Sequence, residues 1–189
     1  MKKIVTGLVL LSLGSSMVLA GDYYGGVNFG FGKGSTEQKN LGISSDYDFE
    51  QTAFGVHGGY YLNLNSKIEI SFKSLKFDFD KGGDDTDGTQ LGVDYLYELN
   101  EVSKLKPYFG GGLSFNSLDI KIANSDTIDG IGLKLRGGVA YSLTSQLYLG
   151  AELNYNYIGW EDLKNTRNDS TLESSSSFYG LGLNVNYKF

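Results

Sequence analysis

The feature that most constrains this chain is an alternation of apolar and polar residues that continues along almost its whole length. In Tyr179–Phe189, every odd position is apolar, and the residues between are glycine, asparagine and lysine. Successive side chains of a β-strand point to opposite faces, so such a segment is expected to be a strand with one apolar face. Eight segments carry the pattern: Tyr23–Phe31, Phe54–Leu62, Ile68–Phe79, Leu91–Leu99, Phe109–Phe115, Ile131–Leu143, Leu147–Tyr157 and Tyr179–Phe189. The expected fold class is therefore all-β.

The connections between these segments alternate in length. The long ones are Lys33–Glu50, Asp80–Gly88, Ser117–Gly130 and Glu161–Ser176, and the short ones are Asn63–Lys67, Asn100–Lys106 and Thr144–Gln146. This interleaving predicts an eight-stranded antiparallel up-and-down barrel with both termini on the short-turn side. Within the third segment, the apolar positions shift by one residue between Phe72 and Leu75, which predicts a β-bulge near Lys73 and Ser74.

The N-terminus has the features of a signal peptide. Lys2 and Lys3 supply positive charge, Ile4–Leu13 is mostly apolar, and small residues lead up to Ala20. The apolar run is too short to span a bilayer as a helix. We therefore expect residues 1–20 to be a signal peptide cleaved between Ala20 and Gly21, and residues 21–189 to form one transmembrane barrel domain.

Alternation alone leaves open whether the apolar face points outward into lipid or inward around a ligand, as in a soluble lipocalin-type barrel. Glycines on the polar face, such as Gly110, Gly112, Gly180 and Gly182, suit a narrow interior better than a surface in water. Aromatic residues of the apolar face also gather near the strand ends, as expected at the two interfaces of a bilayer. These two belts are Tyr23, Tyr60, Tyr97, Phe109, Tyr141 and Tyr187 on the short-turn side, and Phe31, Phe77, Phe79, Phe115, Tyr155, Tyr157 and Tyr179 on the other.

The last segment ends on an aromatic residue, with Tyr187 and Phe189 on its apolar face. It resembles the C-terminal signature by which outer-membrane barrels are recognised for assembly. Lys106–Leu113 also resembles a Pro-Tyr-x-Gly-x-Gly strand, and the whole mature chain resembles the small outer-membrane β-barrels of the OmpA/OmpX type, including "porin family" proteins. The resemblance implies a monomer in the cell outer membrane, in contact with lipid and lipopolysaccharide, whose C-terminal strand engages the barrel assembly machinery. OmpA-type proteins often add a peptidoglycan-binding domain, which we do not expect in a chain that ends at Phe189.

The inward register places several ionisable residues at similar heights in the expected barrel. They are His57, Lys73, Asp94, Arg136 and Glu152, with Lys134 one step higher and Glu69 lower. An unpaired charge in so narrow a space is costly, so opposite charges are expected to pair. If Leu143 opposes Leu147 across the short turn, Arg136 and Glu152 become diagonal neighbours, and Asp94 is a second candidate partner. The family resemblance implies a similar polar plug, which is either a fixed core or a gate that passes water or ions.

Other patterns indicate no catalytic residue, cofactor or metal site. His57 is the only histidine and lies on the expected lumen face without a serine nucleophile on the outer face near it. Asp80–Gly88 is acidic but lacks the ligand spacing of an EF-hand loop, and no helix follows the glycine-rich strand Gly25–Gly32 as a dinucleotide site would require. The net charge of −6, without a basic stripe, argues against a nucleic-acid partner. The chain also has no cysteine for a disulfide or thiolate site.

Four functions remain open at this point. The favoured one is a non-enzymatic barrel that displays four loops outside the cell for envelope integrity, adhesion or surface interaction, because loops on rigid scaffolds commonly carry recognition. The sequence does not identify the loop partner. The alternatives are a small low-conductance channel, a lipid A-modifying enzyme and a soluble ligand-binding barrel.

Overall fold

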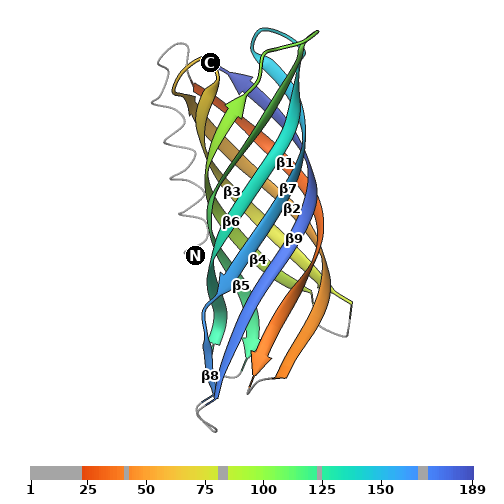
Figure 1. Ribbon diagram of the computed structural model, residues 1–189, viewed down its shortest axis with the longest axis vertical. Coiled ribbons are helices and arrows are strands. Elements are labelled where there is room, and N and C mark those ends of the chain that lie inside the picture. Colours follow the sequence, from red (N-terminus) through yellow and green to blue (C-terminus); the bar gives the residue numbers. More distant parts are fainter. Residues whose placement is uncertain (1–22, 41–42, 81–84, 123–124, 166–169) are drawn as a thin grey trace.

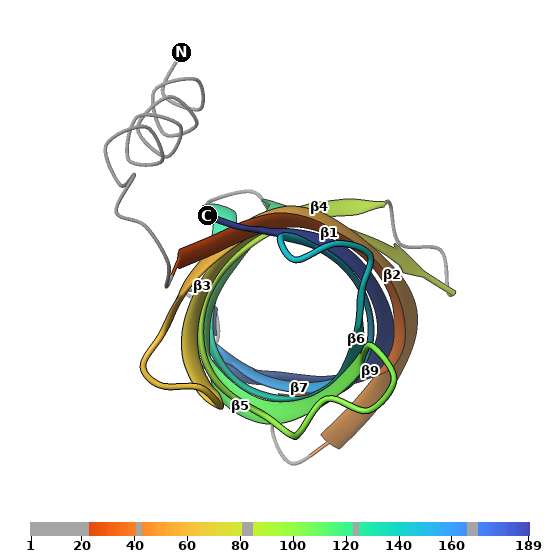
Figure 2. The same cartoon turned by 90° about the horizontal axis from the view of Figure 1, so that it is seen from above.

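The structure, a computed structural model, describes residues 23–40, 43–80, 85–122, 125–165 and 170–189. Its strands are β1 (Tyr23–Asn40), β2 (Ile43–Tyr61), β3 (Ser66–Phe79), β4 (Thr86–Glu98), β5 (Leu105–Ile122), β6 (Ser125–Ser142), β7 (Leu147–Trp160), β8 (Leu163–Asn165) and β9 (Ser170–Lys188). Each strand from β1 to β7 pairs with the next, β7 pairs with β9, and β9 returns to β1. Figure 2 shows the closed ring end on. Eight antiparallel strands therefore form the predicted up-and-down barrel, and the short β8 pairs only with β9. Within the described part of the chain, no helix has the length and hydropathy to cross a membrane.

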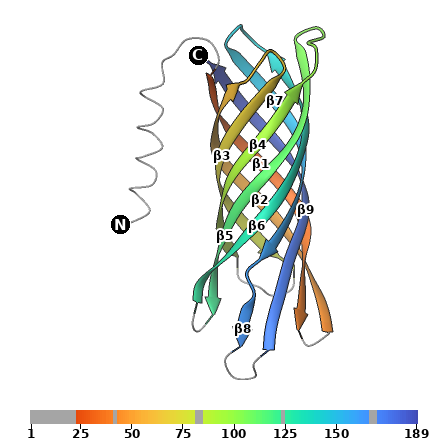
Figure 3. The same cartoon turned by 60° about the vertical axis from the view of Figure 1, so that its left-hand side comes forward.

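The strands run obliquely around the barrel (Figures 1 and 3), and their register fixes the stagger. Stepping across paired residues from Val27 leads through Val56, Phe72, Leu91, Phe115, Ile131, Gly159 and Ser175 to Glu37, back on β1. This displacement of ten residues is the shear of the barrel. Because the shear is even, side chains that point inward on one strand meet inward side chains all around the ring. The inward register of each strand can therefore be compared with that of every other.

The apolar face of the strands points outward. Ile131, Leu135 and Leu153 are 69%, 64% and 67% exposed, whereas the inward Asp94 and Asn116 are 1% and 0% exposed. A soluble protein shows the opposite distribution, and an apolar surface of this extent needs lipid around it. The lipid-facing orientation is confirmed, and the soluble ligand-binding barrel does not fit this arrangement.

An arginine in the middle of the lipid-facing surface tests this orientation. Leu135 lies in the middle of β6 and points outward. Leu135→Arg is expected to lower the free energy of unfolding by about 2–4 kcal/mol, because a charge there lies in hydrocarbon. The matched control is Asp162→Arg, in the exposed segment after β7, which should change it little. Reversible urea unfolding in lipid vesicles measures both, and equal losses would show that the outward register of β6 is wrong.

The predicted bulge near Lys73 and Ser74 is absent, which corrects the sequence analysis. β3 pairs with β2 and β4 in unbroken register through these residues. The shift in hydropathy instead marks a change of face: Ile70 is 54% exposed on the outside, whereas Leu75 and Phe77 are each 2% exposed on the inside. On the long-hairpin side, beyond the lipid, the outer surface meets water, so polar residues face outward and apolar residues fill the interior. We therefore interpret the phase change as the boundary of the lipid-facing region on the long-hairpin side.

The predicted long loops are also corrected, because strand structure continues through much of them. β1 pairs with β2 as far as Asn40 and Ile43, and β5 with β6 as far as Ile122 and Ser125. The last long connection holds β8 and the beginning of β9. These hairpin extensions lie at the lower end of the barrel in Figure 3, opposite the C-terminus and the beginning of β1. They escaped the pattern search because their outer face is polar and apolar residues, such as Phe49 and Ile128, lie only on their inner face.

The aromatic belts are present with two exceptions. On the long-hairpin side, Phe31, Phe115, Tyr155, Tyr157 and Tyr179 are 46–65% exposed on the outer face. Phe77 is buried inside the barrel, and Phe79 packs against the same interior cluster. On the short-turn side, Tyr60, Tyr97, Phe109, Tyr141 and Tyr187 are exposed, and Tyr23 packs on Tyr60 with ring centroids 4.9 Å apart. The lipid-facing surface therefore ends in aromatic side chains at both rims.

Candidate functional site

The lumen contains a layer of ion pairs centred on Arg136, which we call the ion layer. Its Nη1 donates to Glu69 Oε1 at 2.6 Å and to Asp94 Oδ2 at 2.9 Å, and its Nη2 donates to Glu152 Oε2 at 2.7 Å. Lys134 Nζ donates to Asp94 Oδ2 at 2.7 Å. All five side chains are at most 9% exposed. One guanidinium therefore joins carboxylates from three strands, β3, β4 and β7, across the interior.

Register brings these groups together, and glycines make room for them. Arg136 lies opposite Asn154 and Gly138 lies opposite Glu152, which is the pairing that Leu143 against Leu147 implies. A side chain at Gly92 would collide with Lys134 Nζ, and one at Gly112 would collide with Asp94 Oδ1. The lumen glycines thus provide the space that long charged side chains need in an eight-stranded ring.

Two tyrosines complete the ion layer, and the sequence analysis missed them. Tyr24 Oη donates to Glu69 Oε2 at 2.8 Å, and Tyr108 Oη donates to Glu152 Oε2 at 2.9 Å. Charge-assisted hydrogen bonds of this kind stabilise a buried carboxylate. Both tyrosines occupy inward positions beside outward aromatic residues, so the strand register alone could have identified them.

His57 and Lys73 lie in the lumen outside these ion pairs. The imidazole of His57 forms hydrogen bonds with Asn28, at 3.1 Å from Nδ1, and with Asn186 at Nε2, and its Nε2 lies 3.9 Å from Glu69. Ser71 lies opposite His57 across β2 and β3, but its hydroxyl leans toward Gly92. Among the described residues, His57 has no hydrogen bond with a hydroxyl, which a serine nucleophile activated by this histidine would require.

A second ion cluster lies at the short-turn mouth of the barrel and was not predicted. Glu98 lies 2.7 Å from Lys67 Nζ and 2.5 Å from Lys106 Nζ, and it accepts a hydrogen bond from Tyr61 Oη at 3.1 Å. Lys67 Nζ also lies 4.5 Å from the centroid of the Tyr24 ring. These residues line a cavity of about 440 Å³ that opens at this end. Lys67 and Lys106 are the second residues of β3 and β5, but the sequence analysis assigned them to the short connections, where a charge is expected to be exposed to solvent.

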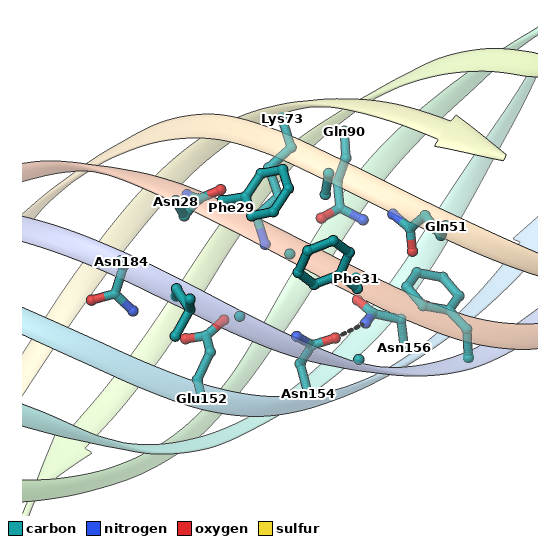
Figure 4. Close-up of a pocket in the computed structure, with 16 residues that line it drawn as sticks. Asn28, Phe29, Phe31, Gln51, Lys73, Gln90, Glu152, Asn154, Asn156 and Asn184 are labelled. Carbon is teal, nitrogen blue, oxygen red and sulfur yellow. Dashed lines mark hydrogen bonds between the residues drawn. The ribbon is translucent and has the colours of Figure 1, made fainter.

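An apolar cluster fills the lumen at the long-hairpin end. Its members are Phe49, Ala53, Leu75, Phe77, Ile128, Ile158, Trp160 and Phe178, which we call the apolar plug. Ile158 is 0% exposed, and Trp160 Nε1 donates to Ser176 Oγ at 2.7 Å. A small polar chamber of about 30 Å³ is lined by Glu152 of the ion layer, by Ala53 and Phe178 of the plug, and by several side-chain amides, some of which Figure 4 labels. Buried ion pairs and packed rings thus occupy the lumen at two levels.

The outer surface above the lipid-facing region carries exposed ion pairs. Lys33 Nζ lies 2.6 Å from Glu50, and Lys76 Nζ lies 2.8 Å from Asp85. The hydrogen bond from Lys33 to Glu50 raises the pKa of that lysine, and the bond from Lys76 to Asp85 does the same there. Such exposed pairs contribute little stability and keep the hairpins polar. The acidic segment Asp80–Gly88 lies partly outside the described residues, among which no group of histidine and acidic side chains is arranged to hold a metal ion.

The remaining site predictions concern the chain ends. Ala20 and Gly21 lie outside the described residues. Tyr187 and Phe189 are 43% and 54% exposed on the outer face, with ring centroids 5.3 Å apart. The Phe189 N–H donates to the Tyr23 carbonyl at 3.0 Å, beside the β9–β1 seam that closes the barrel.

Comparisons with known proteins agree with this architecture. A family model described as the outer membrane protein beta-barrel domain matches residues 6–189. The chain is similar to Neisserial surface protein A, with 23% identity, a TM-score of 0.53, and 86% of this chain and 97% of that chain covered. It is also similar to OprG from Pseudomonas aeruginosa (14% identity, TM-score 0.57, 90% and 97% covered) and to the outer membrane protein AlkL (20%, 0.56, 89% and 91%). At these identities the likeness concerns the fold alone. Comparison with curated protein sequences finds no match.

Proposed function

This chain belongs to the family of outer membrane protein beta-barrel domains and resides in the outer membrane, and we propose that it is a non-enzymatic surface protein with a closed lumen. In this proposal the barrel holds polar β-hairpins rigidly above the membrane, where they contact neighbouring or host surfaces. The observation that carries it is the change of face on β3: the wall continues past the lipid with polar residues outside and the apolar plug inside. Recognition commonly resides on segments held by such a rigid scaffold.

The plug supports display over transport. A pore needs a continuous wet path, whereas the plug is built of packed rings such as Phe49, Phe77 and Phe178, with Phe49 and Phe77 centroids 5.2 Å apart. Hydrophobic constrictions close channels by excluding water. The second candidate, a low-conductance channel, is favoured by the polar chamber and by the cavity at the short-turn mouth. It would require the plug to rearrange.

Single-channel recording in planar bilayers separates these two candidates. Refolded protein is expected to give no opening steps. The ion layer and the plug are barriers in series, so Arg136→Ala and Phe77→Ala are each expected to stay closed while the double variant conducts. Regular openings of the unmodified protein would refute the closed-lumen proposal and favour the channel. The double variant is the control that the recording can detect an opened lumen.

The route to the membrane is part of the same proposal. We infer that residues 1–20 direct export and are removed at Ala20, that the protein is a monomer among lipid and lipopolysaccharide, and that the barrel assembly machinery engages its last strand. The exposed rings of Tyr187 and Phe189 beside the closing seam support the last point.

Replacing the terminal aromatic residue is expected to prevent assembly. Phe189→Asp should strongly reduce the amount of heat-modifiable protein in the outer membrane while export to the periplasm continues. The reason is that the outward ring next to the β1–β9 seam would be lost from the assembly signal. The matched control is Tyr179→Asp, on the outer face in the middle of β9, which keeps the terminal signal. Comparable outer-membrane levels of Phe189→Asp and the unmodified protein would contradict the role given to Phe189.

A further inference from the structure

The boundary of the lipid-facing surface on the long-hairpin side is not level around the barrel. A row of paired residues climbs toward the long hairpins by ten residues in one circuit, or just over one residue per strand. Phe72 on β3 pairs through two strands with Ile131 on β6, so the position of β6 that is level with Phe72 lies about four residues nearer the short turns, at Leu135. Ser74 is then level with Leu133. Ser74 is polar and exposed, whereas Leu133 is an outward leucine with 61% exposure, so the boundary lies nearer the short turns on β3.

The strands on either side of β3 have the same early boundary. Ser74 pairs with Thr89 on β4. Lys76, the next outward residue of β3, pairs with Thr52 on β2, and all four side chains are exposed. At the level of Lys76, the outward residue of β6 is Ile131, which is 69% exposed. Hydroxyl and ammonium groups are costly in hydrocarbon, so the β2–β4 side of the barrel leaves the lipid before the β6 side does.

At the other end of the barrel, the short turns on this side carry apolar residues beyond the aromatic belt. Leu64 in the turn between β2 and β3 is 89% exposed, and Val102 in the turn between β4 and β5 is 67% exposed. Leu64 borders the mouth cavity, but the turn that carries it leans away from the ring in Figure 2. The turn between β6 and β7, residues 144–146, is polar throughout. The side that is short at the long-hairpin boundary is thus extended at the short turns.

These two turn tips continue the lipid-facing surface. Leu62, which is 50% exposed, connects Tyr60 of the aromatic belt with the tip between β2 and β3. Val102 pairs with Leu105, which is 43% exposed on the same surface. Lys104, beside Val102, is also exposed and is placed to meet anionic lipid headgroups. An apolar surface that extends from the lipid-facing wall and ends beside a cation fits a phospholipid leaflet.

We propose that the barrel is tilted in the membrane, with its β3 side displaced toward the long-hairpin end, so that the tips at Leu64 and Val102 lie in the phospholipid leaflet at the short turns. One rotation accounts for both boundaries, because a rigid barrel that draws these tips into lipid moves Ser74 and Thr89 out of it on the same side. Membrane-spanning elements commonly tilt to match their apolar length to the bilayer. The tilt does not depend on what the outer hairpins recognise.

Spin labels at four single cysteines test the tilt. In vesicles of phosphatidylcholine and phosphatidylglycerol, collisions of a nitroxide with oxygen report hydrocarbon, and collisions with a water-soluble nickel chelate report water. The ratio of oxygen to nickel collisions is expected to be several-fold higher at Ser103→Cys, beside Val102, than at Ser145→Cys in the polar turn. It should also be several-fold higher at Leu133→Cys than at Ser74→Cys, although these two positions are level. Equal ratios within either pair would overturn the tilt, and two water-exposed turns would leave the tips to a protein partner.

Replacing both tips tests whether they hold the barrel in this position. Leu64→Asn combined with Val102→Asn is expected to lower the ratio at Ser103→Cys to that at Ser145→Cys. The control is Leu143→Asn, which removes an outward leucine beside the polar turn and should leave the ratio at Ser103→Cys unchanged. Heat-modifiable migration identifies the folded variants, and Leu64→Asn alone, with a smaller decrease expected, replaces the double change if that does not fold. A ratio that stays high without the apolar tips would overturn the proposal.

Discussion

Arg136→Ala is expected to lower the free energy of unfolding by about 3–5 kcal/mol, the usual cost of removing one partner of a buried ion pair. Arg136 is bonded to Glu69, Asp94 and Glu152, and its side chain is only 9% exposed. Its removal leaves three carboxylates with Lys134 as the only directly bound cation among the described residues. Reversible unfolding in lipid vesicles measures the loss.

A double-mutant cycle distinguishes charge pairing from loss of packing. Combining Arg136→Ala with Glu152→Gln should be less destabilising than Arg136→Ala alone, because the second change neutralises one orphaned carboxylate. The recovery is expected to be partial, since Glu69 and Asp94 also lose their guanidinium. Glu50→Gln, on the exposed pair with Lys33, is the matched control and should recover nothing. Strictly additive changes for Arg136 and Glu152 would contradict the ion layer.

Phe77→Ala is expected to cost about 3–5 kcal/mol, the usual range for truncating a buried phenylalanine. Phe77 is 2% exposed and packs against Phe49 inside the barrel, above the lipid-facing region. The cavity left behind should also shift the emission of Trp160, the only tryptophan of the chain and a member of the same plug. Fluorescence-detected unfolding in lipid vesicles reports both effects.

The control for Phe77 is another phenylalanine that points outward. Phe115→Ala removes the same side chain from the lipid-facing belt, where Phe115 is 51% exposed. Lipid refills that space, so a smaller loss and an unchanged Trp160 emission are expected. If both variants lose the same stability, the inward orientation of Phe77 and the change of face on β3 are both wrong.

The sequence allowed the membrane-spanning part of the fold to be predicted because lipid imposes a strict rule on each strand. Every second residue must be apolar, so the pattern gives strand number, order and the facing of residues such as Leu135. The pairing of β6 with β7 also followed from a single short turn, which places Gly138 opposite Glu152. Local alternation and turn length suffice for these features.

The alternation of apolar residues did not predict the strands correctly on the long-hairpin side, where the outer surface of the barrel faces water instead of lipid. Beyond the boundary, a strand needs no apolar outer face, so the outer parts of β1 and β2, within residues 33–50, were predicted as a loop although they pair as far as Asn40 and Ile43. The inward turn of Leu75 and Phe77 was read as a bulge for the same reason. The cluster of Lys67, Lys106 and Glu98 was missed because it joins residues from three strands at the mouth of the barrel. Such contacts depend on closure of the ring.

The most direct test of the account is the side of the membrane to which its two ends are exposed. The chain has no cysteine, so single cysteines can be placed at two exposed serines: Ser45 on the outer part of β2, and Ser145 in the turn between β6 and β7. A membrane-impermeant maleimide added to intact cells is expected to label Ser45→Cys at once, and Ser145→Cys only after the outer membrane is permeabilised. Labelling of Ser145→Cys alone in intact cells, or of both variants equally, would contradict the display of the hairpins outside the cell.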